Sequence, residues 1–193
     1  DEELYKDAKN ALEKAQFKTA YAYFSYLTQR NHAESFNELG DMYFYGRGMA
    51  INQAKALELY KKAAALDSVY GFFNVGFLYW NGPEEIQDPE QALQYLKKAA
   101  QMGYTYALSF IGDIYRTGPE ELIDYVEAKR YYQKGVDVNE INAIKGMALL
   151  YLLGQGVTQN NAMGAFYLKK AADKGNAWAM YHLGRLYYYG EGI

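Results

Sequence analysis

The chain has 193 residues, half of them hydrophobic and about a fifth charged, and its formal net charge is −3. This balance is ordinary for a globular chain with a sizeable core, and an acidic charge without a lysine or arginine cluster argues against nucleic-acid binding. The absence of cysteine excludes disulfides and thiol catalysis. No apolar run is long enough to span a bilayer, so we expect no direct membrane insertion.

The first predicted elements are two helices within residues 1–31. Ala20 and Phe24 lie one period, thirty-six residues, before Ala56 and Tyr60. The Gly-x-Gly loop that joins the later helices is missing here. We therefore expect this pair to have a tighter turn and to cap an array of repeats.

From residue 32 onward the sequence repeats every thirty-six residues without a shift of register. The clearest columns are a tyrosine and, three residues before it, a small residue: Tyr43, Tyr79, Tyr115, Tyr151 and Tyr187, preceded by Gly40, Gly76, Gly112, Ala148 and Gly184. A period of this length indicates supersecondary units that bury their apolar faces against one another. We predict a single array over residues 1–193, with full repeats at 32–67, 68–103, 104–139 and 140–176. A truncated repeat at 177–193 would leave a stacking face uncovered, which suggests a fragment of a longer protein.

Each repeat is predicted to hold two helices, here called the A helix and the B helix. Apolar residues of the A helix follow helical spacing, as at Phe36, Leu39 and Tyr43, and they end at a glycine. A second apolar run, as at Ala56 and Tyr60, predicts the B helix. The chain is therefore expected to be all-α.

The glycine inside the A helix needs a reason, because glycine in a helix interior costs about 1 kcal/mol relative to alanine. We predict that the B helix, with its own small alanines, crosses the A helix there at close range. Ala148, the one replacement, is the next smallest residue. The column is therefore interpreted as packing and not as a ligand site.

These columns together resemble the Sel-one-like repeat family, a relative of the tetratricopeptide repeat, over nearly the whole chain from His32 onward. The fullest match includes Gly154-Gln155-Gly156-Val157 and Lys170-Ala171-Ala172-Asp173-Lys174-Gly175. The resemblance implies a right-handed α-solenoid of antiparallel helix pairs that scaffolds protein complexes, with a tetratricopeptide-like first pair. It also implies a periplasmic, secreted or endoplasmic-reticulum location, although a cytoplasmic one stays open.

The residues that usually carry catalysis do not form a recognisable set. His32 and His182 are the two histidines, and neither has a second histidine four residues on, which argues against a metal site. No serine lies in a nucleophile motif. The Gly-x-Gly loops follow helices instead of strands, which argues against a phosphate site. We expect no enzyme activity, no cofactor and no metal.

Two successive loops are acidic, because residues 82–85 and 118–121 both read Gly-Pro-Glu-Glu. If the repeats stack in register, these loops are neighbours on one edge. They are either solvated loops or a docking point for a basic partner.

The face of the A helices turned away from the core is the predicted partner-binding surface. Phe73, Phe77 and Trp80 form an aromatic stripe on it, either facing solvent as an anchor or covered by a neighbouring helix. Polar residues, Asn37 and Asp41 among them, are expected to hold the backbone or charged groups of a bound segment. The predicted partner-binding set is Phe44, Phe73, Phe77, Trp80, Asp113, Arg116, Lys145, Leu149, Leu152, Tyr181, Arg185 and Tyr188.

These patterns predict a non-enzymatic adaptor that binds a protein or peptide segment in a groove lined by the A helices. The alternative is a structural module of a larger repeat protein, or one that self-associates through its open C-terminal repeat.

Overall fold

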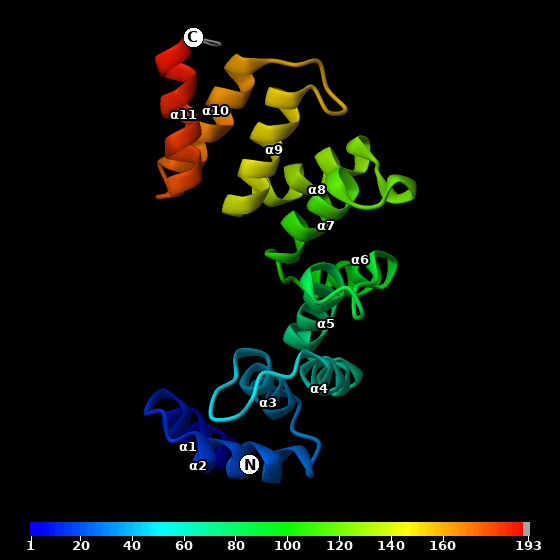
Figure 1. The fold of residues 1–193 in the computed structure, drawn as a ribbon, viewed down its shortest axis with the longest axis vertical. Helices are drawn as coiled ribbons and strands as arrows, with labels where there is room; N and C mark the ends of the chain where they lie inside the picture. Colours follow the sequence, from blue (N-terminus) through cyan, green and yellow to red (C-terminus); the bar gives the residue numbers. More distant parts are fainter. Residues whose placement is uncertain (191–193) are drawn as a thin grey trace. The chain divides into compact units, whose positions relative to one another are not determined.

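The computed structural model describes residues 1–190. Across these residues the chain is all-α, with eleven α-helices, one short 3₁₀ helix and no strand (Figure 1). The fold class predicted from the sequence is thereby confirmed. The helices form two compact units, Asp1–Met102 and Gly103–Ile193.

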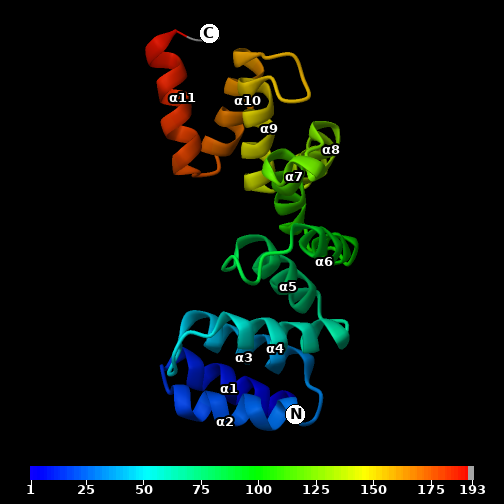
Figure 2. The same cartoon turned by 45° about the vertical axis from the view of Figure 1, so that its right-hand side comes forward.

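The first unit contains the predicted N-terminal pair and two repeats, and consecutive helices pack on one another throughout it. Figure 2 shows α1 to α4 lying side by side. Its helices are α1 (Glu2–Glu13), α2 (Phe17–Thr28), α3 (Ala33–Tyr45), α4 (Gln53–Ala65), α5 (Val69–Asn81) and α6 (Pro89–Gln101).

The second unit continues the alternation of A and B helices. In addition to the contacts between consecutive helices, the A helices α7 and α9 pack on each other. Its elements are α7 (Ala107–Thr117), η1 (Glu120–Leu122), α8 (Tyr125–Asp137), α9 (Ile141–Leu153), α10 (Asn161–Ala172) and α11 (Ala177–Tyr189).

The same backbone contact closes every A and B helix pair of the repeats. The N–H of the residue that caps the B helix donates to the carbonyl oxygen of the column tyrosine. The pairs are Asn52 to Tyr43 at 2.8 Å, Asp88 to Tyr79 at 2.9 Å, Asp124 to Tyr115 at 2.8 Å and Asn160 to Tyr151 at 2.9 Å. Each capping side chain also accepts a backbone N–H of the first helical turn, which typically stabilises a helix by about 1 kcal/mol. The loop and the start of the B helix are therefore fixed together.

The tyrosine column also packs through its rings. Tyr115 stacks on Tyr131 with ring centroids 6.0 Å apart, and Tyr151 stacks on Tyr167 at 5.8 Å. In both pairs the second tyrosine belongs to the B helix of the same repeat. The column therefore joins the two helices of a repeat through both its backbone and its side chain.

The glycine column lies where the B helix crosses at close range, as predicted, and a larger side chain than alanine fills the space. A Cβ added to Gly40 would lie 2.7 Å from Cδ1 of Tyr60, and one added to Gly76 would lie 2.7 Å from Cγ of Leu96. A large side chain of the B helix thus occupies the place of the missing Cβ. Gly184 is different, because among the described residues no atom beyond its own helix backbone and chain neighbours lies within 4 Å of the same position.

The loops between A and B helices use glycine in two ways. Gly46 and Gly154 end their helices in the left-handed conformation, with φ of 68° and 66°. Gly118, in an acidic Gly-Pro-Glu-Glu loop, has an ordinary φ of −70°, and a Cβ there would collide with the carbonyl oxygen of Ile114. The acidic loops are therefore built differently from the Gly-x-Gly loops.

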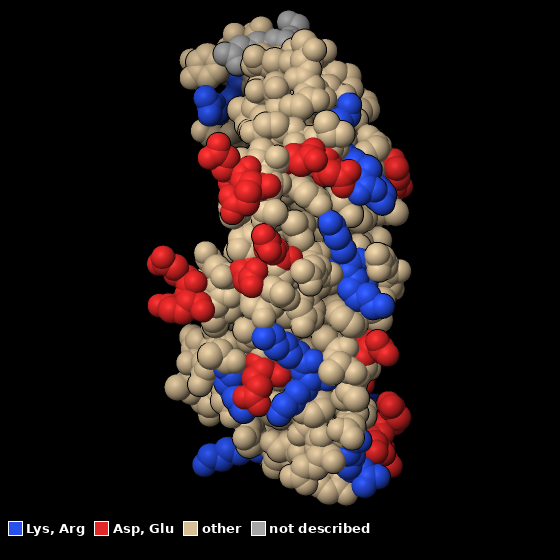
Figure 3. All heavy atoms as spheres, turned by 90° about the vertical axis from the view of Figure 1, so that its right-hand side faces the viewer, with Lys and Arg blue, Asp and Glu red and all other residues tan. Residues whose placement is uncertain are grey.

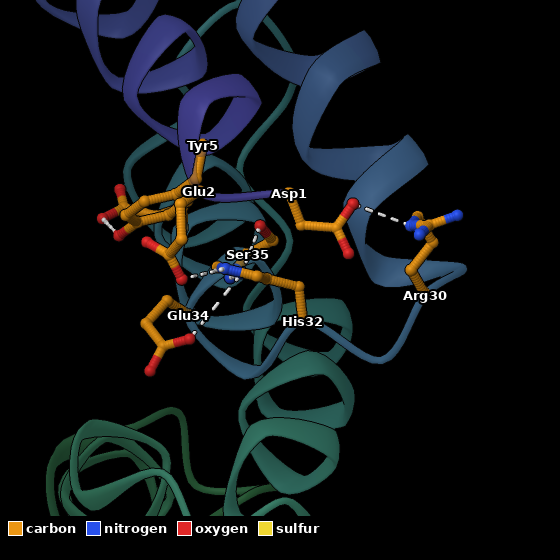
Figure 4. A network of polar contacts seen from close by, with 8 residues as sticks. Asp1, Glu2, Tyr5, Arg30, His32, Glu34 and Ser35 are labelled. Atoms are coloured by element: carbon orange, nitrogen blue, oxygen red, sulfur yellow. Dashed lines mark hydrogen bonds and ion pairs between the residues drawn. The ribbon is translucent and has the colours of Figure 1, made fainter.

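A polar network holds the N-terminal pair to the first repeat (Figure 4). Arg30 pairs with Asp1 at 2.8 Å, which joins the end of α2 to the start of α1. His32 caps α3, and Figure 4 shows its ring between Glu2 and Glu34, at 3.8 and 3.7 Å from their carboxylates. These contacts connect α1, α2 and α3 at one end of the first unit.

Candidate functional site

The predicted aromatic anchor in the first unit is largely part of the packing. Phe73 is only 8% exposed, so of the two alternatives left open by the sequence the covered one holds for this residue. Its ring lies 6.1 Å from that of Phe77, which in turn lies 6.1 Å from that of Phe44. Phe44, Phe77 and Trp80 are half-buried. The rings of the stripe on α5 thus pack against each other and against Phe44 of α3. The sequence pattern of a single repeat does not reveal this packing.

The predicted polar contacts of α7 are occupied within the fold. Tyr132 donates its hydroxyl to Asp113 at 2.6 Å, and Arg116 donates Nε–H to that hydroxyl at 3.1 Å. Burial, followed by the charge of Asp113, raises the pKa of Tyr132, so it remains a proton donor. Asp113 and Arg116 therefore orient a buried tyrosine, a role that the sequence analysis did not assign to them.

The first unit repeats this arrangement. Tyr60 donates its hydroxyl to Asp41 at 2.6 Å. Burial raises the pKa of Asp41 above its ordinary value. Asn37 is buried and donates to Ser68 Oγ at 2.7 Å, so the expectation that Asn37 contacts a bound segment is wrong.

The predicted residues of α9 and α11 meet around a cavity in the second unit. The cavity has a volume of about 200 Å³ and brings together Leu152 of α9 and Arg185 of α11. Its other lining residues are Gln159, Asn161, His182, Leu186 and Tyr189. Tyr181 and Tyr188 stay exposed on α11, at 63% and 84%. The α9–α11 face, as we call it, consists of Lys145, Leu149, Leu152, Trp178, Tyr181, His182, Arg185, Tyr188 and Tyr189.

The cations of the α9–α11 face lie against aromatic rings. The ammonium of Lys145 is 5.7 Å from the ring centroid of Trp178. The guanidinium of Arg185 is 6.0 Å from the ring of Tyr181 and 5.9 Å from that of Tyr189. Such cation–π contacts are favourable by about 0.5–1 kcal/mol when exposed. They hold both positive charges on the surface between α9 and α11.

His182 lies on α11 between Trp178, whose ring faces the ammonium of Lys145, and Arg185. Its ring centroid is 4.0 Å from that of Trp178. Burial, and then the charge of Arg185, lowers the pKa of His182 below its ordinary value of 6.5. The imidazole is therefore neutral at neutral pH, and it can both donate and accept a hydrogen bond.

Trp178, His182 and Tyr189 were not part of the partner-binding set predicted from the sequence. With Arg185 they follow the spacing i, i+4, i+7 and i+11, which places them on one side of α11. The predicted surface positions were those left after the core columns of the earlier repeats were subtracted. Trp178 does not fall on one of these positions. The helical spacing of large residues within α11 itself was the signal that could have identified them.

Other kinds of site find no support in the described residues. Residues 1–190 contain no cluster of three or more metal-ligating side chains. No helix among them is long and apolar enough to cross a membrane. On the face shown in Figure 3, acidic and basic side chains are interspersed.

The helix pairs repeat every thirty-six residues, and in the repeats a small residue lies at the helix crossing and a tyrosine joins the two helices. These features define an α-helical repeat protein of the solenoid class. The chain belongs to the Sel1 repeat family, whose model matches residues 33–68, 73–104, 105–138, 141–176 and 179–193. Members of this family are generally scaffolds for protein interactions, and their fold is typically not catalytic. No curated protein matches the sequence.

Solved structures show the same fold. A Sel1 repeat protein from Oxalobacter formigenes is 28% identical with a TM-score of 0.83, and the alignment covers 98% of this chain and 77% of that one. A protective antigen of uropathogenic Escherichia coli is 30% identical with a TM-score of 0.79, covering 91% of this chain and 38% of its own. An immunity protein from Pseudomonas aeruginosa is 22% identical with a TM-score of 0.56, covering 92% and 67%, and shows the fold alone.

Proposed function

We propose that this chain is a non-enzymatic scaffold that binds a segment of a partner protein on its α9–α11 face. The observation that carries the proposal is the cavity between α9 and α11, which is lined by Arg185 and the exposed Tyr189. The exposed Tyr181 and Tyr188 and the cation Lys145 belong to the same face. Tyrosine, tryptophan and arginine are the residues that most often dominate binding energy at protein interfaces. Their concentration around one cavity favours this face over the self-packed aromatic stripe of the first unit.

The size of the cavity favours a polypeptide over a small metabolite. Small-molecule sites usually enclose about 300–1,000 Å³. The cavity here, about 200 Å³, suits one side chain of a partner. The tyrosines at its margin, Tyr181 and Tyr188, offer contact area to the neighbouring residues of the same segment. Because a tyrosine side chain has few rotatable bonds, ordering it on binding costs little entropy.

Site-specific photocrosslinking tests the proposal. A benzoylphenylalanine in place of Tyr188 should give a protein adduct in a lysate of the source organism, and Arg185→Ala with Tyr189→Ala should abolish it. Tyr187 is the matched control, because it is 55% exposed but points to the opposite side of α11 from Arg185. Equal adducts at positions 187 and 188, or an adduct that survives the double substitution, would contradict the proposal.

A second candidate function is a structural module that self-associates through α11, and it is supported by the open space beside Gly184. In the earlier repeats a side chain of the next helix fills the equivalent space, as Tyr60 does beside Gly40. A B-like helix of a second copy would fit there. Sedimentation of the full chain at increasing concentration distinguishes the candidates, since this one requires association that a large residue at position 184 (Gly184→Leu) abolishes.

A further inference from the structure

Among residues 1–190, no acidic side chain pairs with the two cations of the α9–α11 face. Elsewhere in the second unit Arg116, Arg130 and Lys169 each pair with a carboxylate of their own helix or the residue that follows it. No carboxylate of the described residues lies within 4.0 Å of the ammonium of Lys145 or the guanidinium of Arg185. Their charges are therefore available to a ligand.

A ligand that displaces water from these cations meets charges that discriminate between ligand groups more strongly than charges on an open surface do. Each cation is held over an aromatic ring, and Arg185 also lines the cavity. A ligand that enters the cavity displaces water from around the guanidinium. A carboxylate then replaces the lost water with charge-assisted hydrogen bonds, whereas a neutral or basic group does not.

The spacing of the cations sets the spacing of the acidic groups they would meet. Arg185 is the repeat equivalent of Leu149, four residues beyond Lys145, so the two Cα atoms differ by about 6 Å along the helix axes. The ammonium of Lys145 lies beside Trp178, seven residues before Arg185, so the offset of the two charged groups along the helix axis is between about 6 and 10 Å. An extended chain advances about 3.3 Å per residue. Two or three residues of a bound segment therefore cover this distance.

We infer that the α9–α11 face recognises an acidic segment of a partner protein, with two carboxylate side chains two or three residues apart and an apolar side chain beside them. One carboxylate pairs with Lys145 and the other with Arg185. The apolar side chain enters the cavity against Leu152 and Leu186. This inference rests on the proposed function and adds the chemistry of the partner to it.

Selection from a library of random short peptides tests the inference directly with the full chain. Peptides that bind the wild type should be enriched in Asp or Glu pairs at the stated spacing. Replacing both acidic residues of a selected peptide with Gln should weaken binding about tenfold, as expected for two partly exposed ion pairs. Lys145→Gln with Arg185→Gln should weaken it equally, and added salt should reduce the difference.

Lys134→Gln with Lys174→Gln is the matched control, because it removes the same charge from exposed positions outside the face. This variant should bind the acidic peptides as the wild type does. A library that yields no binders, binders without acidic enrichment, or acidic binders indifferent to the loss of Lys145 and Arg185 would overturn the inference. Neutral peptides that block crosslinking at position 188 would overturn it while leaving the proposed function intact. Association of the free chain through its own acidic loops would replace the partner with a second copy.

Discussion

Replacing Gly112 with alanine tests how tightly the A and B helices of a repeat are joined. A Cβ at this position would lie 2.6 Å from Cδ1 and 2.9 Å from Cζ of Tyr132, where ordinary contacts are 3.4–4 Å. The ring has little room to move, because it is fully buried and Gly146 of α9 approaches the same ring atoms closely. Its hydroxyl is bonded to Asp113 and Arg116. The substitution therefore strains packing and hydrogen bonds at once.

The expected effect is a net loss of stability. Overpacking a well-packed core costs about 1–3 kcal/mol, and a weakened buried hydrogen bond costs about 1 kcal/mol more. Removing a glycine from a helix interior offsets about 1 kcal/mol of this. A net loss of about 2 kcal/mol should lower the melting temperature by about 4–8 °C for a chain of this size. Circular dichroism at the helical minimum during thermal and urea unfolding measures it.

Gly184→Ala is the matched control in the same sequence column. Nothing among the described residues lies within 4 Å of the added Cβ, so only the gain in helix propensity of about 1 kcal/mol remains. The two substitutions should therefore change stability in opposite directions. If Gly112→Ala unfolds at or above the wild-type temperature, the tyrosine ring is not the constraint we describe.

Three further predictions concern single residues of the two units. Because the pKa of Asp41 is raised in the fold, the folded chain holds the Asp41 proton more tightly than the unfolded chain does. The stability that Asp41 contributes is therefore greatest below its ordinary pKa of 3.8, and it falls as the pH rises through the raised pKa. Asp41→Asn should thus gain stability relative to wild type between acidic and neutral pH in urea titrations, while a constant difference would contradict this assignment. Leu168→Ala should cost about 2–5 kcal/mol in urea unfolding, since the side chain is fully buried, and a loss under 1 kcal/mol would show that the site collapses around the gap. Asn176→Ala should cost about 1 kcal/mol, because Asn176 accepts the N–H of Ala179 at the start of α11, and hydrogen exchange should show faster exchange in the first turn only.

The helices could be predicted from the sequence because each repeat states the same pattern again. The tyrosine column, the glycine column and helical apolar spacing agree in several copies, so accidental matches cancel. What fills the space beside each glycine was not predicted, although the signal was present. Tyr60 and Tyr132 accompany Asp41 and Asp113, and Leu168 accompanies Leu149 in the same two columns. Reading pairs of columns would have shown a hydroxyl bonded to a carboxylate in some repeats and an apolar pair in others.

The candidate site was less predictable because exposure depends on neighbours that a repeat pattern does not specify. Phe73 occupies the same column as Asn37 and Ser109, and all three are buried. Subtracting the core columns of one helix pair therefore misidentified these three residues as surface, whereas Lys145 and Tyr181 of the same column are half-buried and exposed, respectively. Arg185 and Leu152 were predicted as residues of the A-helix face, and the cavity that both line follows from the packing of α10 against α9 and of α11 against α10.

The pairing of Asp113 with Tyr132 also limits how these hairpins can be recombined. Whole hairpins carry both halves of the pair and can be exchanged as cassettes. A chimera whose junction falls in the loop would instead join halves of different kinds. Such a chimera would place the tyrosine hydroxyl against an apolar side chain, or leave the aspartate carboxylate without its hydrogen-bond donor. Chimeras with a junction in the loop should therefore be stable when the two repeats that are joined lie an even number of repeats apart.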